Sequence, residues 1–235
     1  MSKEWSILLS SDDQAFIQKM QWYYDLYEDM NAEWSQKVFP LQSHYIENAN
    51  SFNAPASAQY LYLAFYGSFQ SIQNAIAYLK EYCCIVCYDA YEHIYELAEL
   101  CLKLDLKQLY VFSDPKNAEY FAELMVVQYA CDQLIGIDCA DIRDCLASDA
   151  TTIRILCKKS ITSYEEQFEN VHRALLYAKS NYKGLYDFSL FFEETYKLLP
   201  NIDDCLFMAY FNNPLFIEEQ GMVYVESEIP FRTKE

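Results

Sequence analysis

Carboxylate side chains are the most abundant groups in this chain that could take part in catalysis. The 235 residues include 35 aspartates and glutamates, and some of these stand as adjacent pairs: Glu165–Glu166, Glu193–Glu194, Asp203–Asp204 and Glu218–Glu219. Two carboxylates can serve as general acid and general base, but such a pair needs burial and a raised pKa. The sequence indicates neither, so we interpret these pairs as solvated faces and turns.

Cysteine and histidine could bind a metal, support redox chemistry or supply a nucleophile. Cys84 and Cys87 form a CxxC motif, but it lies inside the apolar run YCCIVCY and no second pair follows it. Zinc sites commonly combine two such pairs. The three histidines, His44, His93 and His172, are scattered without ligand spacing. We therefore predict no metal site, and we interpret most of the nine cysteines as small buried thiols in a reducing compartment.

Glycine, which phosphate-binding loops require, is scarce. The chain has four glycines, Gly67, Gly136, Gly184 and Gly221, where an average content of about 7% would give roughly 16. A phosphate loop needs clustered glycines because its backbone must turn tightly and bring N–H groups close to the anion. We expect Gly184 and Gly221 at turns and Gly67 at a close packing contact inside a helix. None remains for a phosphate, so we expect no nucleotide cofactor.

The elements that must position these groups alternate between strands and helices. In the first part of the chain, apolar runs predict strands over 5–10, 83–88 and 109–113. Helical spacing and capping patterns predict helices over 12–36, 56–80, 89–104 and 115–134, with a long connection over 37–55. Strands and helices in series indicate parallel strands covered by helices, which is a Rossmann-like α/β arrangement.

The second part of the chain follows a different pattern. We predict helices over 138–147, 162–179 and 189–199, and strands over 151–158, near Leu185, over 205–211 and over 222–230, with the last two strands close enough to pair antiparallel. We therefore divide the chain into a nucleotide-binding-like α/β domain over 1–135, including a long helix over 116–135, and an α+β domain over 136–235.

Three segments follow one another in an order that resembles a known family. The first is AYLKEYCCIVCYDAYEHIYELAELCLKLDLKQLYVFSDP, the second joins the helix over 116–135 to IGIDCADIRDCL, and the third is the strand, helix, helix, strand, strand order of the C-terminal part. Together they cover most of residues 80–231 and are similar to the tubulin/FtsZ family. The resemblance implies that family's two-layer arrangement of a Rossmann-like part and an α+β part.

The chain departs from this family where the family binds GTP. In place of the GGGTGTG phosphate loop, Tyr88 continues directly into DAYEHIY, and Ile7–Leu9 is followed by SSDDQAF instead of a glycine-rich loop. Aspartates at the amino end of a helix oppose anion binding, because the anion depends on open N–H groups and the positive end of the helix dipole. We therefore expect that the chain does not bind GTP in the family manner.

Asp138, Asp141 and Asp144 form the first candidate interface. Asp138 and Asp141 match the two acidic positions of the family's catalytic loop, with Gly136 in place of its asparagine. In the family this loop enters the nucleotide pocket of the next subunit, so the resemblance implies a surviving interface. The alternative is that carboxylates three residues apart at a helix start serve only as caps and dipole partners.

Aromatic side chains form the second candidate interface. Tyr62, Tyr66 and Phe69 belong to a segment of high aromatic density. Tyrosine and tryptophan commonly anchor protein partners, so these residues could form an exposed aromatic patch. Their spacing also fits the buried side of the helix predicted over 56–80, and the sequence leaves both interpretations open.

The charge balance limits the classes of partner. The net charge is −18, which repels nucleic acid and anionic membranes. No apolar run approaches the roughly 20 residues that a bilayer-spanning helix needs. We therefore expect a cytoplasmic protein without nucleic-acid or membrane partners.

Taken together, these patterns predict a non-catalytic, tubulin/FtsZ-like protein that acts through protein–protein contacts, either with itself or with a true family member. The alternative is an acidic inhibitor or immunity-type protein that blocks a basic, nucleic-acid-binding partner. An enzyme with an unrecognised site is a third hypothesis, because cysteines and carboxylates are plentiful.

Overall fold

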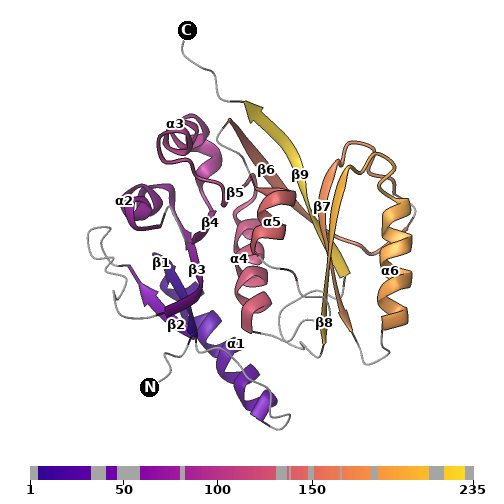
Figure 1. The fold of residues 1–235 in the computed structure, drawn as a ribbon, viewed down its shortest axis with the longest axis horizontal. Coiled ribbons are helices and arrows are strands. Elements are labelled where there is room, and N and C mark those ends of the chain that lie inside the picture. The colour runs from indigo at the N-terminus through magenta and orange to yellow at the C-terminus, as the bar shows by residue number, and fades with distance from the viewer. Residues whose placement is uncertain are drawn as a thin grey trace.

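The strands of the protein form one continuous sheet. The computed structural model describes residues 5–32, 41–46, 59–79, 83–130, 137, 139–147, 151–164, 166–180, 185–211 and 220–230. The strands within these ranges are β1 (Trp5–Ser11), β2 (Leu41–Tyr45), β3 (Gln59–Gly67), β4 (Cys83–Cys87), β5 (Leu109–Phe112), β6 (Thr152–Ser160), β7 (Arg173–Ser180), β8 (Asp204–Phe211) and β9 (Gln220–Pro230). Their order across the sheet is β2-β1-β3-β4-β5-β6-β9-β7-β8 (Figure 1).

Most of this sheet is parallel. β1 pairs in parallel with β2 and β3, and parallel pairing continues through β4 and β5 to β6. β9 runs antiparallel to both β6 and β7, and β8 is parallel to β7. Eight of the nine described strands therefore point the same way. Such strands are buried on both faces, which explains the continuous apolar runs CCIVC in β4 and LYVF in β5.

Helices cover both faces of the sheet. The described helices are α1 (Gln14–Ala32), α2 (Phe69–Leu79), the 3-10 helix η2 (Ala90–His93), α3 (Ile94–Leu104), α4 (Pro115–Ala130), α5 (Cys139–Leu146) and α6 (Leu185–Lys197). Along β1, Ile7 and Leu9 join a core with α1, α4 and α5, whereas Leu8 joins a core with α2 and α3. A third core packs α6 against β7 and β9. None of the described helices is both long and apolar enough to cross a membrane.

This architecture is the α/β fold with parallel strands and helices that the sequence predicts. The two-layer arrangement implied by the family resemblance is not confirmed, because helices lie on both faces of the sheet. The predicted domain boundary, between residues 135 and 136, lies outside the described residues. One sheet continues across it, since Val111 and Phe112 of β5 pair with Ile155 and Leu156 of β6.

Two predicted helices are wrong in large part. The segment over 56–80 contains β3 followed by α2, and the segment over 162–179 ends in β7. Strands buried on both faces carry apolar side chains at almost every position. Apolar residues three and four positions apart therefore occur in such strands as they do in helices. Leu175 and Tyr177 face one core while Ala174 and Leu176 face the other, which is the alternation of a strand.

Three smaller expectations also fail. Residues 41–45, expected in a connection, form β2, and the strand expected near Leu185 is the start of α6. The last two strands do not pair with each other, because β7 separates β8 from β9 in the sheet. These differences arise from pairing partners distant in sequence, which local patterns do not specify.

Cysteine thiols are part of the core. Cys84, Cys87, Cys101 and Cys145 are buried and form no disulfide, as the sequence predicts. Burial raises the pKa of Cys101 and of Cys145 from the ordinary 9.0 to about 12. These thiols therefore stay protonated in the folded protein at neutral pH, and they are poor nucleophiles because the thiolate is the reactive form.

We expect the free energy of unfolding to fall as the pH rises above about 9. The unfolded chain releases the Cys101 and Cys145 protons near pH 9.0, whereas the folded chain holds them to about pH 12. Their stabilising contribution is therefore complete below pH 9.0 and lost as the pH approaches 12. Urea unfolding at about pH 8 and about pH 10.5 measures this slope. Cys101→Ala should make the slope shallower, and an unchanged slope would contradict the assignment.

Candidate functional site at the carboxyl edge of the sheet

The helices that follow β1 and β3 leave the sheet on opposite faces. β1 and β3 are neighbours, yet α1 packs on one face and α2 on the other. In open parallel sheets such a reversal leaves a crevice at the carboxyl ends of the strands, and ligands commonly bind there. A ligand site is therefore expected among the residues that follow β1, β3 and β4.

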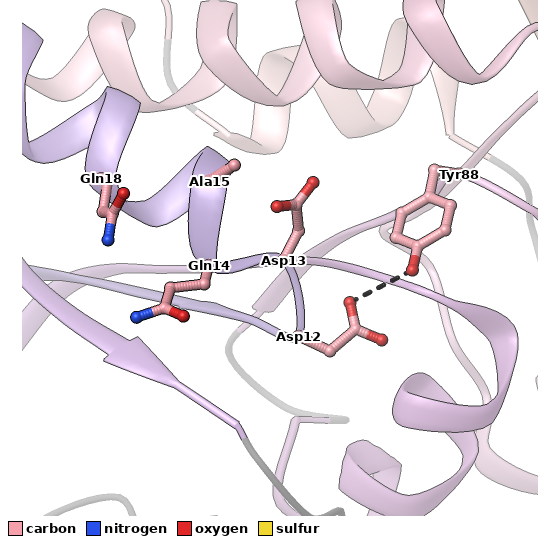
Figure 2. Close-up of a pocket in the computed structure, with 6 residues that line it drawn as sticks. All are labelled: Asp12, Asp13, Gln14, Ala15, Gln18 and Tyr88. Carbon is pink, nitrogen blue, oxygen red and sulfur yellow. Dashed lines mark hydrogen bonds between the residues drawn. The ribbon is translucent and has the colours of Figure 1, made fainter.

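A pocket of about 590 Å³ lies at this point of the sheet. It is lined by Asp12, Asp13, Gln14, Ala15, Gln18 and Tyr88. Figure 2 shows that the two aspartates come from the loop between β1 and α1, the glutamines from the first turns of α1, and Tyr88 from the residue after β4. The sequence singled out the segments after Leu9 and after Tyr88 as places where a phosphate loop is missing, and the structure brings these two segments together.

Asp12 holds the amino end of α2. Its carboxylate accepts hydrogen bonds from the backbone N–H of Ser68 at 3.2 Å and from the Ser68 hydroxyl at 2.5 Å. The Ser71 hydroxyl also donates to it. Ser68 in turn is the N-cap of α2, because its Oγ accepts from the Ser71 N–H at 3.3 Å. A carboxylate from the end of β1 thus occupies the position beside this helix start.

Two other aspartates occupy neighbouring helix ends. Asp89, after β4, accepts a hydrogen bond from the backbone N–H of Phe69 at 2.6 Å, in the first turn of α2. Asp13 caps α1 by accepting from the N–H of Phe16 at 3.1 Å. Beside this cap, Ser11 Oγ accepts a hydrogen bond from the Asp13 N–H at 3.0 Å.

Tyr88 contributes a protonated phenol to the pocket. Burial raises the pKa of Tyr88 to about 12, and the nearby Asp12 carboxylate adds to the rise. The phenol therefore donates, and its oxygen lies 3.5 Å from Asp12 Oδ1 (Figure 2). The ring of Tyr66 packs against that of Tyr88 at a centroid distance of 5.3 Å, with the planes tilted by 48°. Burial likewise raises the pKa of Tyr66.

The pocket attracts cations and repels anions. Two of its lining residues are carboxylates, and none of the six described lining residues is basic. Lys19, one residue beyond Gln18, is engaged with Glu119 at 2.8 Å and with the buried Glu123. A phosphate entering here would meet carboxylates already bonded to the N–H groups it requires. Within the described part of the chain, no three His, Cys, Asp or Glu side chains are placed to hold a metal ion.

The acidic candidate interface lies elsewhere in the fold. Asp138 is outside the described residues. Asp141 and Asp144 are exposed on α5, where Arg143 Nε donates to Asp144 Oδ1 at 2.8 Å. Because α5 packs against β7 and β8, these two residues are remote in the sheet order from the carboxyl ends of β1 and β3. Their role as an interface remains a prediction.

The aromatic candidate interface is largely internal. Tyr66 and Phe69 are buried, each in one of the two main cores, as the core interpretation expects. They therefore do not form an exposed patch. Tyr62 lies in β3, opposite Ile7 of β1, and its side chain is outside the described part. No sequence pattern indicates a role for Ser68 and Ser71, because their hydroxyls reach the Asp12 carboxylate only when β1 and β3 are neighbours in the folded sheet.

Comparisons with known proteins do not show a family. Neither protein-family models nor curated proteins give a match to this chain. Among solved structures, the chain is similar to an empty FtsZ dimer from M. jannaschii, with a TM-score of 0.30 and 12% sequence identity over 69% of this chain. The chain spans about half of that FtsZ chain, 52% of its length.

Proposed function

We propose that this protein binds no nucleotide at the carboxyl edge of its sheet and acts through protein–protein contacts, either with itself or with a tubulin/FtsZ-like protein. The observation that supports the first half is the pair of carboxylates at the amino end of α2. The N–H groups of Ser68 and Phe69, which a phosphate would need, already donate to Asp12 and Asp89. An anion would have to displace two negative charges to reach them, which is unfavourable in a partly buried site.

The charge and the exposed aromatic side chains of the surface support the proposal of protein–protein contacts. A net charge of −18 disfavours nucleic acid and anionic lipid as partners. Large aromatic side chains are nevertheless exposed, among them Trp22, Tyr91, Tyr95 and Tyr196. Exposed aromatic residues are the commonest anchors of protein interfaces. That the partner is a tubulin/FtsZ-like protein, and that this chain is a degenerate member of that family, remain hypotheses of the sequence resemblance.

Thermal unfolding with nucleotide tests the first half. We expect GTP and ATP, each with Mg²⁺ and at up to about 1 mM, to leave the melting temperature unchanged, because a ligand that binds the folded state raises it. Guanosine and inorganic phosphate are the matched controls for base and phosphate recognition. A melting temperature that rises with GTP concentration, and not with guanosine, would contradict the proposal.

Light scattering tests the second half. We expect the purified protein to associate either with itself or with a purified FtsZ or tubulin, and to do so without added nucleotide. Scattering that stays at the monomer value in every mixture would contradict association with itself, FtsZ or tubulin. It would favour the acidic-inhibitor function described below.

A second candidate function rests on the charge. An acidic inhibitor that blocks a basic, nucleic-acid-binding protein would use the carboxylates that the described surface offers, including those of the pocket. Such a complex should weaken steeply between about 50 and about 200 mM salt, because its exposed charge pairs are screened. An affinity that does not change with salt concentration would exclude the acidic-inhibitor function.

A further inference from the structure

Helix α3 and the 3-10 helix η2 that precedes it expose three large apolar side chains. Tyr91, Tyr95 and Leu102 are 54%, 75% and 48% exposed. Tyr91 lies in η2, whereas Tyr95 and Leu102 lie seven residues apart on one line of α3. We call these three side chains the α3 stripe. Burying such side chains against a partner releases more free energy than leaving them in water.

The stripe is held on a rigid support. The opposite side of α3 places Ile94, Leu97 and Cys101 in the core with α2 and the sheet. At the start of the helix, the ring of His93 stacks on Phe69 of α2, with ring centroids 4.4 Å apart and planes 13° apart. The stripe therefore presents its side chains without rearrangement of the backbone. In Figure 1, α3 lies at the outside of the molecule next to α2.

A row of carboxylates runs beside the stripe. Glu92 of η2 and Glu96 and Glu99 of α3 are exposed, and Glu96 and Glu99, three residues apart, lie on one side of α3. Lys103 is the exposed cation that follows Glu99 by one turn on that side. The surface of η2 and α3 thus combines exposed apolar side chains with exposed carboxylates that outnumber the lysine. This arrangement is complementary to an amphipathic segment that carries lysine or arginine next to its apolar side chains.

We propose that the α3 stripe and the glutamate row dock a basic amphipathic helix of a partner protein. The inference rests on the protein-contact half of the proposed function and names its surface and partner. Apolar side chains of the partner would cover Tyr91, Tyr95 and Leu102, and its cations would reach the glutamates and the faces of the tyrosine rings. A second copy that met this surface with its own α3 would bring the same glutamates against it, and its net charge of −18 disfavours it as the occupant.

Binding of synthetic peptides tests the proposal. The probe is a fluorescently labelled helical peptide of leucine and lysine, about 18 residues long, and its binding is followed by anisotropy. A leucine–glutamate peptide and an oligolysine are the matched probes. The protein variants are Tyr91→Ser with Tyr95→Ser, and Glu92→Gln with Glu96→Gln and Glu99→Gln. The control variants on α6 are Tyr196→Ser, at a site 51% exposed, and Glu193→Gln with Glu194→Gln.

We expect the leucine–lysine peptide to bind and the leucine–glutamate peptide not to bind. The tyrosine double variant should weaken binding of the leucine–lysine peptide by about tenfold or more, while its affinity for oligolysine stays the same. The glutamine triple variant should flatten the salt dependence of binding. Both α6 controls should bind like the unmodified protein, and melting temperatures should be unchanged because all replaced side chains are exposed.

Three results would overturn the inference: no binding of the leucine–lysine peptide, equal binding by the tyrosine double variant, or the same loss in the α6 controls. The inference and the proposed function can fail separately. If GTP raises the melting temperature while the tyrosine variant still loses peptide affinity, the nucleotide half of the proposed function fails and the docking surface stands. If GTP leaves the melting temperature unchanged and the tyrosine variant binds the peptide as tightly as the unmodified protein, only the docking surface is wrong.

Discussion

Replacing Asp12 by alanine is expected to lower the free energy of unfolding by about 3 kcal/mol, because a hydrogen bond to a charged group contributes roughly 1.5–3 kcal/mol. The Asp12 carboxylate accepts from the Ser68 N–H, the Ser68 hydroxyl and the Ser71 hydroxyl. Its loss leaves the amino end of α2 with the Ser68 N-cap and the Asp89 hydrogen bond, and it removes a charged acceptor from two part-buried hydroxyls. Urea unfolding followed by circular dichroism measures the change, with the denaturant slope used to check that the transition stays two-state.

A matched control separates this role from ordinary helix capping. The side-chain carboxylate of Asp114 accepts a hydrogen bond from the backbone N–H of Lys116 at 2.9 Å, at the exposed start of α4. Asp114→Ala should cost about 1 kcal/mol, the usual value for an N-cap aspartate. If Asp12→Ala costs no more than Asp114→Ala, then Asp12 does not connect β1 with α2 and the account of the site is wrong.

The composition of this site was predictable from sequence, but its assembly was not. The missing glycines after Leu9 and Tyr88, and the aspartates in their place, are visible in the chain itself. That Asp12 bonds to Ser68, 56 residues away, depends on β1 and β3 being neighbours. Strand neighbours are set by pairing across the sheet, which leaves no local signature. The Asp114–Pro115 start of α4 was predicted correctly because both the cap and the first-turn proline act within one turn.

The errors in secondary structure have one physical cause. In β3 and β7 the sheet is buried on both faces, so aromatic and apolar residues follow each other without the alternation that identifies a half-buried strand. The same composition in α2, which has one face in the core, gives a similar local pattern over a short window. Whether such a segment forms a strand or a helix is decided by the strands that pair with it, as Ile7 of β1 pairs with Tyr62 of β3.

The role of Gly221 also depends on strand pairing, which the local sequence does not specify. A turn was expected there, but Gly221 lies inside β9, opposite Ser160 of β6 and Tyr177 of β7. A Cβ on Gly221 would collide with the Oη and Cζ atoms of Tyr177, and it would lie 2.9 Å from the carbonyl oxygen of Lys159. Tyr177 is fully buried, so its ring has no free space to enter. A glycine is therefore required by the close approach of a neighbouring strand.

Gly221→Ala is accordingly expected to lower the free energy of unfolding by about 3 kcal/mol, at the upper end of the usual cost of overpacking a core. The control is a double-mutant cycle with Tyr177→Leu, which removes the ring atoms that the new methyl group would meet. In that background Gly221→Ala should cost about 1 kcal/mol or less, because only the contact with the Lys159 carbonyl remains, giving a coupling of about 2 kcal/mol. Additive costs in the cycle would show instead that Gly221 is needed for its backbone and not for the space it leaves to Tyr177. The four unfolding curves, of the unmodified protein, the two single variants and the double variant, are measured in urea at one pH and decide between these two physical explanations.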